Sequence, residues 1–230
     1  MISLMGDLGL AMTGIELVVK GEENLWAERP AVFVFNHQSS ADLFIGAKLL
    51  RKDITAVAKE ELKMTPIGPL LMAADVVFVD RKNHKKAVDA LRPAVEALKS
   101  GRSIAIAPEG TRSKDKTLGK FKKGAFHLAM QAGVPIIPMV IRNASDVLPK
   151  GSMFVRSTAV EVKVLPPIST EKWSMSNLNE NVRLVRNLFL RELGQPEEEI
   201  ETELADKNGN LNGHHASRKE ITPELDNKPG

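Results

Sequence analysis

The sequence predicts a single α/β domain with a mostly parallel central sheet flanked by helices. Short apolar runs of strand length alternate with segments in which apolar residues recur every three or four positions. Polar residues follow several of the apolar runs directly. At 230 residues with 43% hydrophobic residues, the chain can bury one substantial core. Ligands of such folds bind beyond the carboxyl ends of the strands, so we expect the active site at that edge.

The N-terminal segment, residues 1–13, is apolar but too short to cross a membrane. Asp7 and Glu16 interrupt the apolar run before it reaches the roughly 20 residues that a span requires. We expect a short amphipathic helix over residues 2–12 and then a strand at residues 15–19. The helix either contacts a membrane surface or only packs on the body of the protein.

Residues 31–35 form an almost unbroken apolar run, which predicts a strand buried on both faces. A helix from about residue 41 to 51 follows, and Ser39 or Ser40 can serve as its N-cap. The side of this helix that we expect to be buried carries Leu43, Phe44, Ala47 and Leu50.

The remaining elements follow from the same patterns. Further buried strands are predicted at residues 54–58, 76–79, 103–107 and 136–141. Residues 160–164 alternate apolar and polar side chains, as in a half-exposed edge strand. We expect an irregular or helical connection at 62–72 and helices at 83–101, 122–132 and 178–193, with Pro93 bending the first of these helices or marking its restart.

Composition restricts the chemistry. The chain contains no cysteine, which excludes disulfides, thiolate metal ligands and a thiol nucleophile. None of the five histidines stands beside a second ligand at zinc-like spacing, so we predict no metal. Only 4% of the residues are aromatic, and no basic segment is interleaved with aromatics, which argues against a nucleic-acid partner.

Charge divides the chain at about residue 197. The formal net charge of +3 comprises about +8 for residues 1–196 and −5 for residues 197–230. A basic body suits phosphorylated ligands or an anionic membrane surface. The acidic tail lacks apolar periodicity and becomes rich in Asn and Gly, so we expect residues 197–230 to be disordered. The folded domain is therefore predicted to cover residues 14–196.

His37 and Asp42 are the candidate catalytic residues. They stand five residues apart, directly after the buried strand at residues 31–35. A carboxylate in the first turn of the next helix faces unpaired N–H groups and the positive end of the helix dipole, so we expect it to stay ionised and to hold an imidazole N–H. The other ring nitrogen can then accept a proton. A satisfied loop histidine beside an ordinary first-turn acid would show the same spacing.

Residues 108–113, Pro-Glu-Gly-Thr-Arg-Ser, follow a predicted strand and suit a phosphomonoester. Gly110 permits close backbone approach, Thr111 supplies a hydroxyl, and Arg112 offers a planar fork of donors. Glu109 would repel a phosphate, so we expect it to play a supporting role by holding Arg112 or a backbone N–H. A tight turn with a surface arginine is the structural alternative.

Other basic residues follow predicted strands or this loop. Lys59 and Arg81 stand at two further strand ends, where each is a phosphate ligand or a solvated surface residue. Five lysines come after the loop, and they either meet anionic headgroups or donor phosphates or stay solvated: Lys114, Lys116, Lys120, Lys122 and Lys123.

Together these segments resemble the glycerolipid acyltransferase family, and within it the enzymes that acylate 1-acyl-sn-glycerol 3-phosphate. The run from Asn36-His37 to Asp42 is similar to the family's N-H-x-x-x-x-D block. Residues 78–81, 108–113 and 134–138 resemble its second, third and fourth blocks, in the family's order. The resemblance covers about residues 14–168.

The resemblance implies transfer of a fatty acyl group to the free hydroxyl of a lysophosphatidic acid-type acceptor, which gives phosphatidic acid. Acyl-CoA or an acyl carrier protein thioester would be the co-substrate, with no permanently bound cofactor. The enzyme would lie peripherally on the cytoplasmic face of an anionic membrane. His37, oriented by Asp42, would remove the hydroxyl proton.

The phosphate of the acceptor would be held by Lys59, Arg81, Gly110, Thr111 and Arg112. Backbone N–H groups near His37 or at Gly110 are the candidates for stabilising the oxyanion.

The chain departs from the family pattern at two places. The second block usually opens with Gly, and Asp75 stands near that position; the third usually has Phe before its Pro, where this chain has Ala107. Either change can reshape the acceptor pocket without removing the chemistry. Family members also usually begin with longer membrane-associating helices, so this chain has lost them or is one part of a larger polypeptide.

Three other functions compete with this one. Glycerol 3-phosphate or another lysophospholipid could be the acceptor. A hydrolase with a Ser-His-Asp triad would use the same scaffold, but the chain has no G-x-S-x-G elbow. A non-catalytic anionic-lipid-binding module could keep the pocket, and the intact His37 and Asp42 argue against it.

Overall fold

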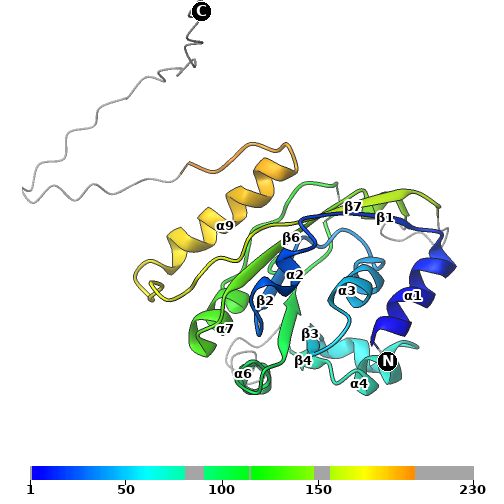
Figure 1. The fold of residues 1–230 in the computed structure, drawn as a ribbon, viewed down its shortest axis with the longest axis horizontal. Coiled ribbons are helices and arrows are strands. Elements are labelled where there is room, and N and C mark those ends of the chain that lie inside the picture. Colours follow the sequence, from blue (N-terminus) through cyan, green and yellow to red (C-terminus); the bar gives the residue numbers. More distant parts are fainter. Residues whose placement is uncertain (1, 81–90, 114, 148–155, 200–230) are drawn as a thin grey trace, which may run out of the picture. The chain divides into compact units, whose positions relative to one another are not determined.

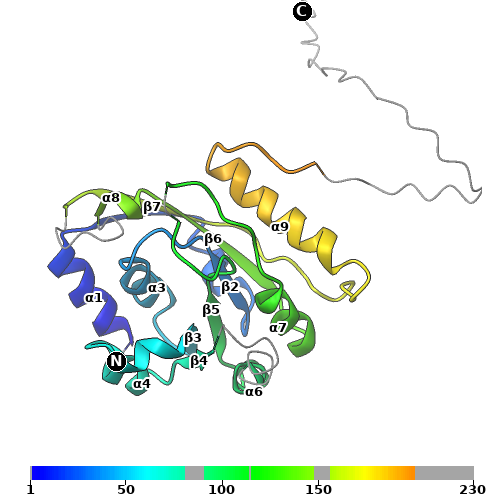
Figure 2. The same ribbon diagram turned by 180° about the vertical axis from the view of Figure 1, so that it is seen from behind.

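The computed structural model describes residues 2–80, 91–113, 115–147 and 156–199 (Figures 1 and 2). Seven strands in this part of the chain form one sheet in the order β1-β7-β6-β2-β5-β3-β4. Their bounds are β1 Glu16–Lys20, β2 Val32–Phe35, β3 Ile54–Lys59, β4 Val77–Val79, β5 Ser103–Ile106, β6 Ile136–Arg142 and β7 Ala159–Val164.

The sheet is mostly parallel, as the sequence predicts. Strands β6, β2, β5, β3 and β4 run in one direction, whereas β7 is antiparallel to β6 and parallel to β1. The carboxyl ends of the five parallel strands therefore share one edge of the sheet. His37 and the loop that begins at Ala107 follow β2 and β5 at this edge, and Lys59 is the last residue of β3.

Helices cover both faces of the sheet (Figure 1). Helices α6, α7 and α9 pack on one face, and α1, α2, α3 and α8 on the other. The helices are α1 Ile2–Thr13, α2 Asn24–Ala27, α3 Asp42–Leu50, α4 Gly68–Ala73, α6 Arg92–Lys99, α7 Gly124–Ala132, α8 Ala144–Val147 and α9 Leu178–Glu192, with the 3₁₀ helix η1 at Glu60–Met64.

The two-residue period of the strands divides the core between the two faces. Val32 and Val34 of β2 pack under α7 and α9, whereas Phe33 points to the side of α3. All three side chains are fully buried. The prediction that β2 is covered on both faces is confirmed, and this rigid strand fixes where the following loop begins.

The prediction that residues 160–164 form an edge strand is wrong. Strand β7 lies between β6 and β1, and β1 is the edge. The alternation itself is present, because Val160, Val162 and Val164 are buried while Glu161 and Lys163 are partly exposed. Alternating side chains show that one face of a strand is less buried than the other. They do not show whether the strand pairs with one neighbouring strand or with two.

Helix α3 differs from its prediction in two respects. Its N-cap is Ala41, which makes no side-chain capping bond, and the Ser39 hydroxyl oxygen accepts the Ala41 N–H over 3.2 Å just before the helix begins. Ala47 and Leu50 are buried as predicted, but Leu43 and Phe44 are only half-buried, and Ile45 and Leu49 are buried as well. The buried face therefore coincides only in part with the predicted one, and the side with Leu43 and Gly46 borders a cavity described below.

Other predicted elements lie partly outside the described residues. Helix α6 begins at Arg92 with Pro93 in its first turn, and residues 83–90 of the predicted 83–101 helix are not described. Residues 200–230 of the predicted tail are not described either. The short helices α2 and α8 have no counterpart among the predictions, because four-residue helices carry too few apolar positions to show a period.

Helix α1 packs closely on α3. A Cβ atom at Gly6 would lie 2.4 Å from the backbone nitrogen of Lys48, and one at Gly9 would lie 2.1 Å from the ring of Phe44. These two glycines bring the helix axes together, so the N-terminal segment is part of the packed body. Within the described ranges, every helix is too short or too polar to serve as a membrane span.

Candidate active site

The loop between β2 and α3 brings His37 and Asp42 together. His37 Nδ1 lies 2.8 Å from Asp42 Oδ2. Because the ionised carboxylate can only accept, this geometry places the ring proton on Nδ1 and leaves the lone pair of Nε2 available. The His37 side chain is 30% exposed and that of Asp42 is 1% exposed. The candidate base is thus accessible, while the carboxylate that would orient it is buried.

Backbone donors hold the Asp42 carboxylate. The N–H groups of Gln38 and Ser39 each donate to Asp42 Oδ2 over 2.9 Å. We predicted donors from the first helical turn, but the loop before the helix supplies them. The other oxygen, Oδ1, is buried and accepts no hydrogen bond within the described part of the chain.

Asn36 fixes the start of the loop at residues 36–41, which we call the catalytic loop after its candidate residue His37. Its side-chain amide donates to the Ile141 carbonyl over 2.8 Å, and its oxygen accepts the Ile141 N–H over 2.7 Å. This pair of bonds extends the pairing of β2 with β6 by one residue. The His37 ring meets the Phe35 ring edge to face, with centroids 6.1 Å apart. Position and tilt of the imidazole are therefore set by its neighbours in the sequence.

Glu109 connects the loop after β5 to the backbone of His37. Its Oε1 accepts the His37 N–H over 2.7 Å, and its Oε2 accepts the Gly119 N–H over 2.8 Å. Of the two supporting contacts predicted for Glu109, the structure shows the one to backbone N–H groups. Burial raises the pKa of the Glu109 carboxyl above its ordinary value of 4.5, and the two N–H donors oppose that rise.

The same loop also holds the carbonyl of His37. The Ser113 N–H donates to the His37 oxygen over 2.9 Å. Between Glu109 and Ser113 the chain turns tightly, with Gly110 at φ +72° and its N–H bonded to the Ala107 carbonyl. Both polar groups of the His37 peptide backbone are thus fixed by this one turn.

Arg112 is the predicted phosphate ligand that the structure places next to the catalytic loop. Its Nη1 donates to Ser40 Oγ over 2.8 Å, three residues after His37. Thr111 is exposed beside it, and the Lys122 side chain lies against Gly110, where a Cβ would be 3.1 Å from Lys122 Nζ.

The other predicted phosphate ligands are less closely joined to this group. Lys59 is the exposed last residue of β3, and β5 separates that strand from β2 in the sheet. Arg81 and Lys114 lie outside the described residues, so their positions relative to the loop stay predictions.

The backbone N–H groups that we considered for the oxyanion already have acceptors. Those of Gln38 and Ser39 bond to Asp42, that of His37 bonds to Glu109, and that of Gly110 bonds to Ala107. These N–H groups serve to fix the loop.

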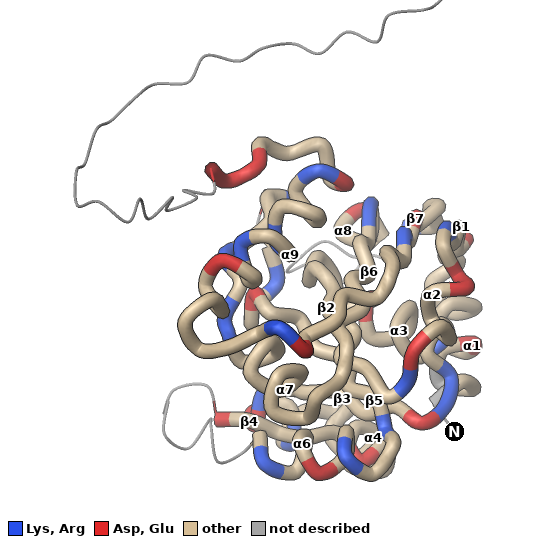
Figure 3. Tube along the Cα trace, turned by 60° about the vertical axis from the view of Figure 1, so that its left-hand side comes forward, with Lys and Arg blue, Asp and Glu red and all other residues tan. Residues whose placement is uncertain are grey.

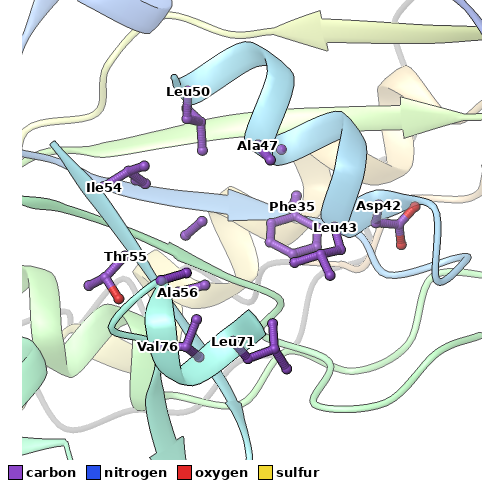
Figure 4. Close-up of a pocket in the computed structure, with 13 residues that line it drawn as sticks. Phe35, Asp42, Leu43, Ala47, Leu50, Ile54, Thr55, Ala56, Leu71 and Val76 are labelled. Atoms are coloured by element: carbon purple, nitrogen blue, oxygen red, sulfur yellow. The ribbon is translucent and has the colours of Figure 1, made fainter. Parts of the chain in front are cut away.

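An apolar cavity borders the catalytic loop (Figure 4). It encloses about 540 Å³ of empty space, including its open mouth. Asp42 and Leu43 lie at one end of the lining, and Leu50 and Ile54 lie at the other. The remaining lining residues come from β2, α3, β3, α4, β5 and the segment between α4 and β4: Phe35, Gly46, Ala47, Thr55, Ala56, Leu71, Ala74, Val76 and Ala105.

The cavity lining offers almost no polar groups to a ligand. Thr55 donates its hydroxyl to the Asp75 carbonyl over 2.6 Å, and Asp42 is engaged by the loop. Across residues 2–80, 91–113, 115–147 and 156–199, no three His, Cys, Asp or Glu residues are grouped as metal ligands would be. The space therefore suits a hydrocarbon chain.

The departure at Asp75 has a structural explanation. Asp75 adopts φ +55°, a left-handed conformation that glycine reaches without strain and that Asp tolerates better than most residues. Its carbonyl accepts the Thr55 hydroxyl, and its carboxylate pairs with Arg102. These contacts hold the residue in the conformation that the position requires.

Sequence reasoning missed two residues that shape the site. Ser40 receives the Arg112 side chain, and Gly119 supplies a donor to Glu109. A Cβ at Gly119 would lie 2.8 Å from Glu109 Oε2, so a side chain at this position would displace the Glu109 carboxylate. A lone glycine ten residues after Glu109 gives no signal of that contact in the sequence.

The chain matches the family model described as "Acyltransferase" over residues 16–142. It is 38% identical over 191 residues to the 1-acyl-sn-glycerol-3-phosphate acyltransferase of Saccharomyces cerevisiae, which covers 80% of this chain and 62% of the yeast protein. The enzyme of the same name from Limnanthes douglasii is 33% identical over 192 residues, which is 83% of this chain and 68% of that protein.

A solved structure shares the fold. The crystal structure of the 1-acyl-sn-glycerophosphate (LPA) acyltransferase PlsC from Thermotoga maritima matches with a TM-score of 0.73 and 30% sequence identity. The match covers 84% of this chain and 77% of that one.

Proposed function

This chain belongs to the acyltransferase family, and on that premise we propose that it transfers a fatty acyl group from an acyl thioester to the free hydroxyl of lysophosphatidic acid. The product is phosphatidic acid, so the reaction is a step of phospholipid biosynthesis. The names of the relatives support this acceptor. The thioester is proposed on chemical grounds, because a thiolate is a good leaving group for a single displacement.

One observation carries the proposal. The His37 ring is bonded through Nδ1 to the buried Asp42 carboxylate at 2.8 Å, and Asp42 itself lines one end of an apolar cavity. A hydrocarbon chain in that cavity would bring its carboxyl end to the catalytic loop. Base and acyl group would then meet without any movement of the sheet.

The reaction follows from the free lone pair of His37 Nε2. This nitrogen takes the proton of the acceptor hydroxyl as the hydroxyl oxygen attacks the thioester carbonyl carbon. The tetrahedral intermediate collapses by breaking the C–S bond, and the departing thiolate takes the proton back from Nε2. Asp42 stabilises the imidazolium that exists between the two transfers. No covalent acyl-enzyme is required.

The acceptor would be held by its phosphate. The Arg112 guanidinium donates to Ser40, three residues after His37, and Gly110 and Thr111 are its neighbours in the sequence. We assign Lys59 and Arg81 to the same role at the same sheet edge. This arrangement converts the meeting of two substrates into an oriented encounter. The enzyme would work at the cytoplasmic face of an anionic membrane as a peripheral protein.

The test uses the purified chain with lysophosphatidic acid and either acyl-CoA or acyl carrier protein thioester. We expect thiol release that depends on the acceptor and yields phosphatidic acid. His37→Ala should lower the rate by about 10²–10⁴-fold, the usual contribution of a general base. Asp42→Asn should also abolish most of the turnover while the fold is retained.

His127→Ala is the matched control, because His127 is a half-buried histidine of α7 away from the catalytic loop. Thiol release without acceptor would indicate a hydrolase, and lipid binding without any release would indicate a binding module. Full turnover by His37→Ala, in a preparation free of host enzyme, would refute the mechanism.

A further inference from the structure

Helix α9 lies beyond residues 16–142, the part that matches the family model, yet it contacts the loop that supports the catalytic histidine. Arg186 of α9 donates from Nε to the Gly119 carbonyl over 2.9 Å and from Nη2 to the Leu118 carbonyl over 2.8 Å. The Arg186 side chain is only 12% exposed. A planar guanidinium can serve two neighbouring carbonyls at once, which fixes the orientation of the peptide between them.

That peptide is directly connected to the catalytic loop. The N–H of Gly119, whose carbonyl Arg186 holds, donates to Glu109 Oε2. The other oxygen of the same carboxylate accepts the N–H of His37. Three consecutive hydrogen-bonded links, each 2.7–2.9 Å long, therefore run from α9 to the backbone of the catalytic base.

The segment after α9 holds Arg186 in place. Glu198 pairs with Arg186 Nη1 at 2.6 Å. Asn187 fixes Glu198, because its side chain bonds both the N–H and the carbonyl of that residue. Gln195 adds a second connection to the loop, accepting the Leu118 N–H and donating to the Lys116 carbonyl. Residues 195–198 thus form a strap that closes over the loop at 116–119.

We propose that Arg186 is a positioning residue for the proposed acyl transfer, acting on His37 through the Gly119 peptide and Glu109. The effect of Arg186 on catalysis rests on the proposed function. Its role in holding the loop at residues 116–119 rests on the contacts alone. Arg186 contacts the 116–119 loop and not the reacting groups, so its loss should lower the rate of the chemical step more than the binding of either substrate.

The catalytic test compares Arg186→Ala with Arg183→Ala, an exposed arginine on the same helix one turn earlier. We expect Arg186→Ala to lower kcat on the order of 10–100-fold, the scale of a small misplacement of a catalytic group, with KM for lysophosphatidic acid little changed. Arg183→Ala should match the wild type. Equal kcat values for Arg186→Ala and the wild type would overturn the proposal.

Chemical rescue separates positioning from general destabilisation. Guanidinium ion at millimolar concentration can occupy the space that Arg186→Ala leaves between the two carbonyls and Glu198. We expect it to restore part of kcat in this variant and to have no such effect on Glu109→Ala. If guanidinium did not restore kcat in Arg186→Ala, and KM rose by the same factor by which kcat fell, the role of Arg186 would be merely structural. That result would count against the proposal.

Hydrogen–deuterium exchange tests the contacts without any activity. In Arg186→Ala the amides of Gly119 and His37 should exchange faster, while amides of β6 keep their wild-type protection. If Arg186→Ala changed the exchange in this way but the wild type showed no acyl transfer, the positioning role would stand and the proposed function would fail. Unchanged exchange at both amides would overturn the positioning itself.

Gln195→Ala serves as a second variant should Arg186→Ala fail to fold. It removes the contacts to Leu118 and Lys116 and leaves Arg186 in place. We expect a smaller loss of kcat in the same direction and faster exchange at residues 116–119. Wild-type exchange and kcat in this variant would show that the strap does not support the loop.

Discussion

At the scale of single residues, the site separates into groups that the sequence can reveal and groups that only the fold assembles. His37 and Asp42 can be predicted because one short loop carries both. The supporting role of Glu109 could also be anticipated, since a carboxylate is a poor neighbour for phosphate. Arg186 could not, because the carbonyls that it holds are 67 and 68 positions away in the chain.

Glu109 gives the protein a defined pH dependence of stability. Its native pKa is raised by burial, so between the ordinary value of 4.5 and the native pKa the folded chain binds more proton than the unfolded chain. The stabilisation from this group is complete below the unfolded pKa and is lost as pH rises through the native pKa. We expect Glu109→Gln to lack this component.

Urea unfolding at several pH values checks this prediction. The free energy of unfolding of the wild type should fall relative to that of Glu109→Gln as pH rises from about 4.5. The variant should also lose about 1–3 kcal/mol of stability at every pH, because its amide nitrogen cannot accept the second N–H. Parallel pH profiles for the two proteins would contradict the raised pKa.

At the scale of elements, patterns identify strands and helices but not their neighbours. The buried strands β2, β5 and β6 stand close to where the sequence predicts them. The wrong prediction of an edge strand at residues 160–164 shows the limit of such patterns. Both β1 and β7 have alternating burial, and only the pairing of the strands decides that β1 lies at the edge. Likewise, the period of α3 locates a helix, while the cavity beside it decides which side stays half-buried.

Gly46 of α3 makes the apolar cavity testable. A Cβ at this position would meet no atom within 4 Å, and the residue lines the cavity. Under the proposed function, Gly46→Leu should fill part of the space and shift the preference of the enzyme toward shorter acyl chains. The measurement is the ratio of kcat/KM for long-chain and short-chain acyl-CoA.

Gly46→Ala is the control for this experiment. It adds one methyl group and should stabilise the helix by up to about 1 kcal/mol with little change in chain-length preference. An unchanged preference in Gly46→Leu, with its folding intact, would mean that the acyl chain binds elsewhere.

At the scale of the whole molecule, the sheet and its covering helices follow from composition and period, whereas the order of the strands does not. The charge pattern is similar in this respect. The body has an excess of basic residues in the sequence, yet basic and acidic positions are both scattered over the trace (Figure 3). The net charge therefore predicts an attraction to anionic surfaces, but it does not identify which face of the protein would contact them.

We propose helix α1 as the face for membrane contact. Leu4, Leu8 and Met12 are spaced by four residues and are 61%, 55% and 85% exposed. We expect the chain to sediment with vesicles that contain anionic phospholipid and to be released by rising salt. Leu8→Asp should weaken this binding about tenfold or more, as the loss of one buried leucine implies.

Leu184→Asp provides the comparison for Leu8→Asp, because Leu184 is a similarly exposed leucine of α9. It should bind vesicles as the wild type does. Equal binding by all three proteins would exclude α1 as the membrane-contacting face.

The position of β1 at the edge of the sheet has a consequence for biosynthesis. Its neighbour in the sheet is β7, with Glu16 opposite Ala159. A ribosome that adds ~5–20 residues per second delivers β7 on the order of ten seconds after β1. Throughout that interval β1 has no strand to pair with on either side, so the nascent chain offers the β-edge that β7 later covers to chaperones until translation has passed residue 164.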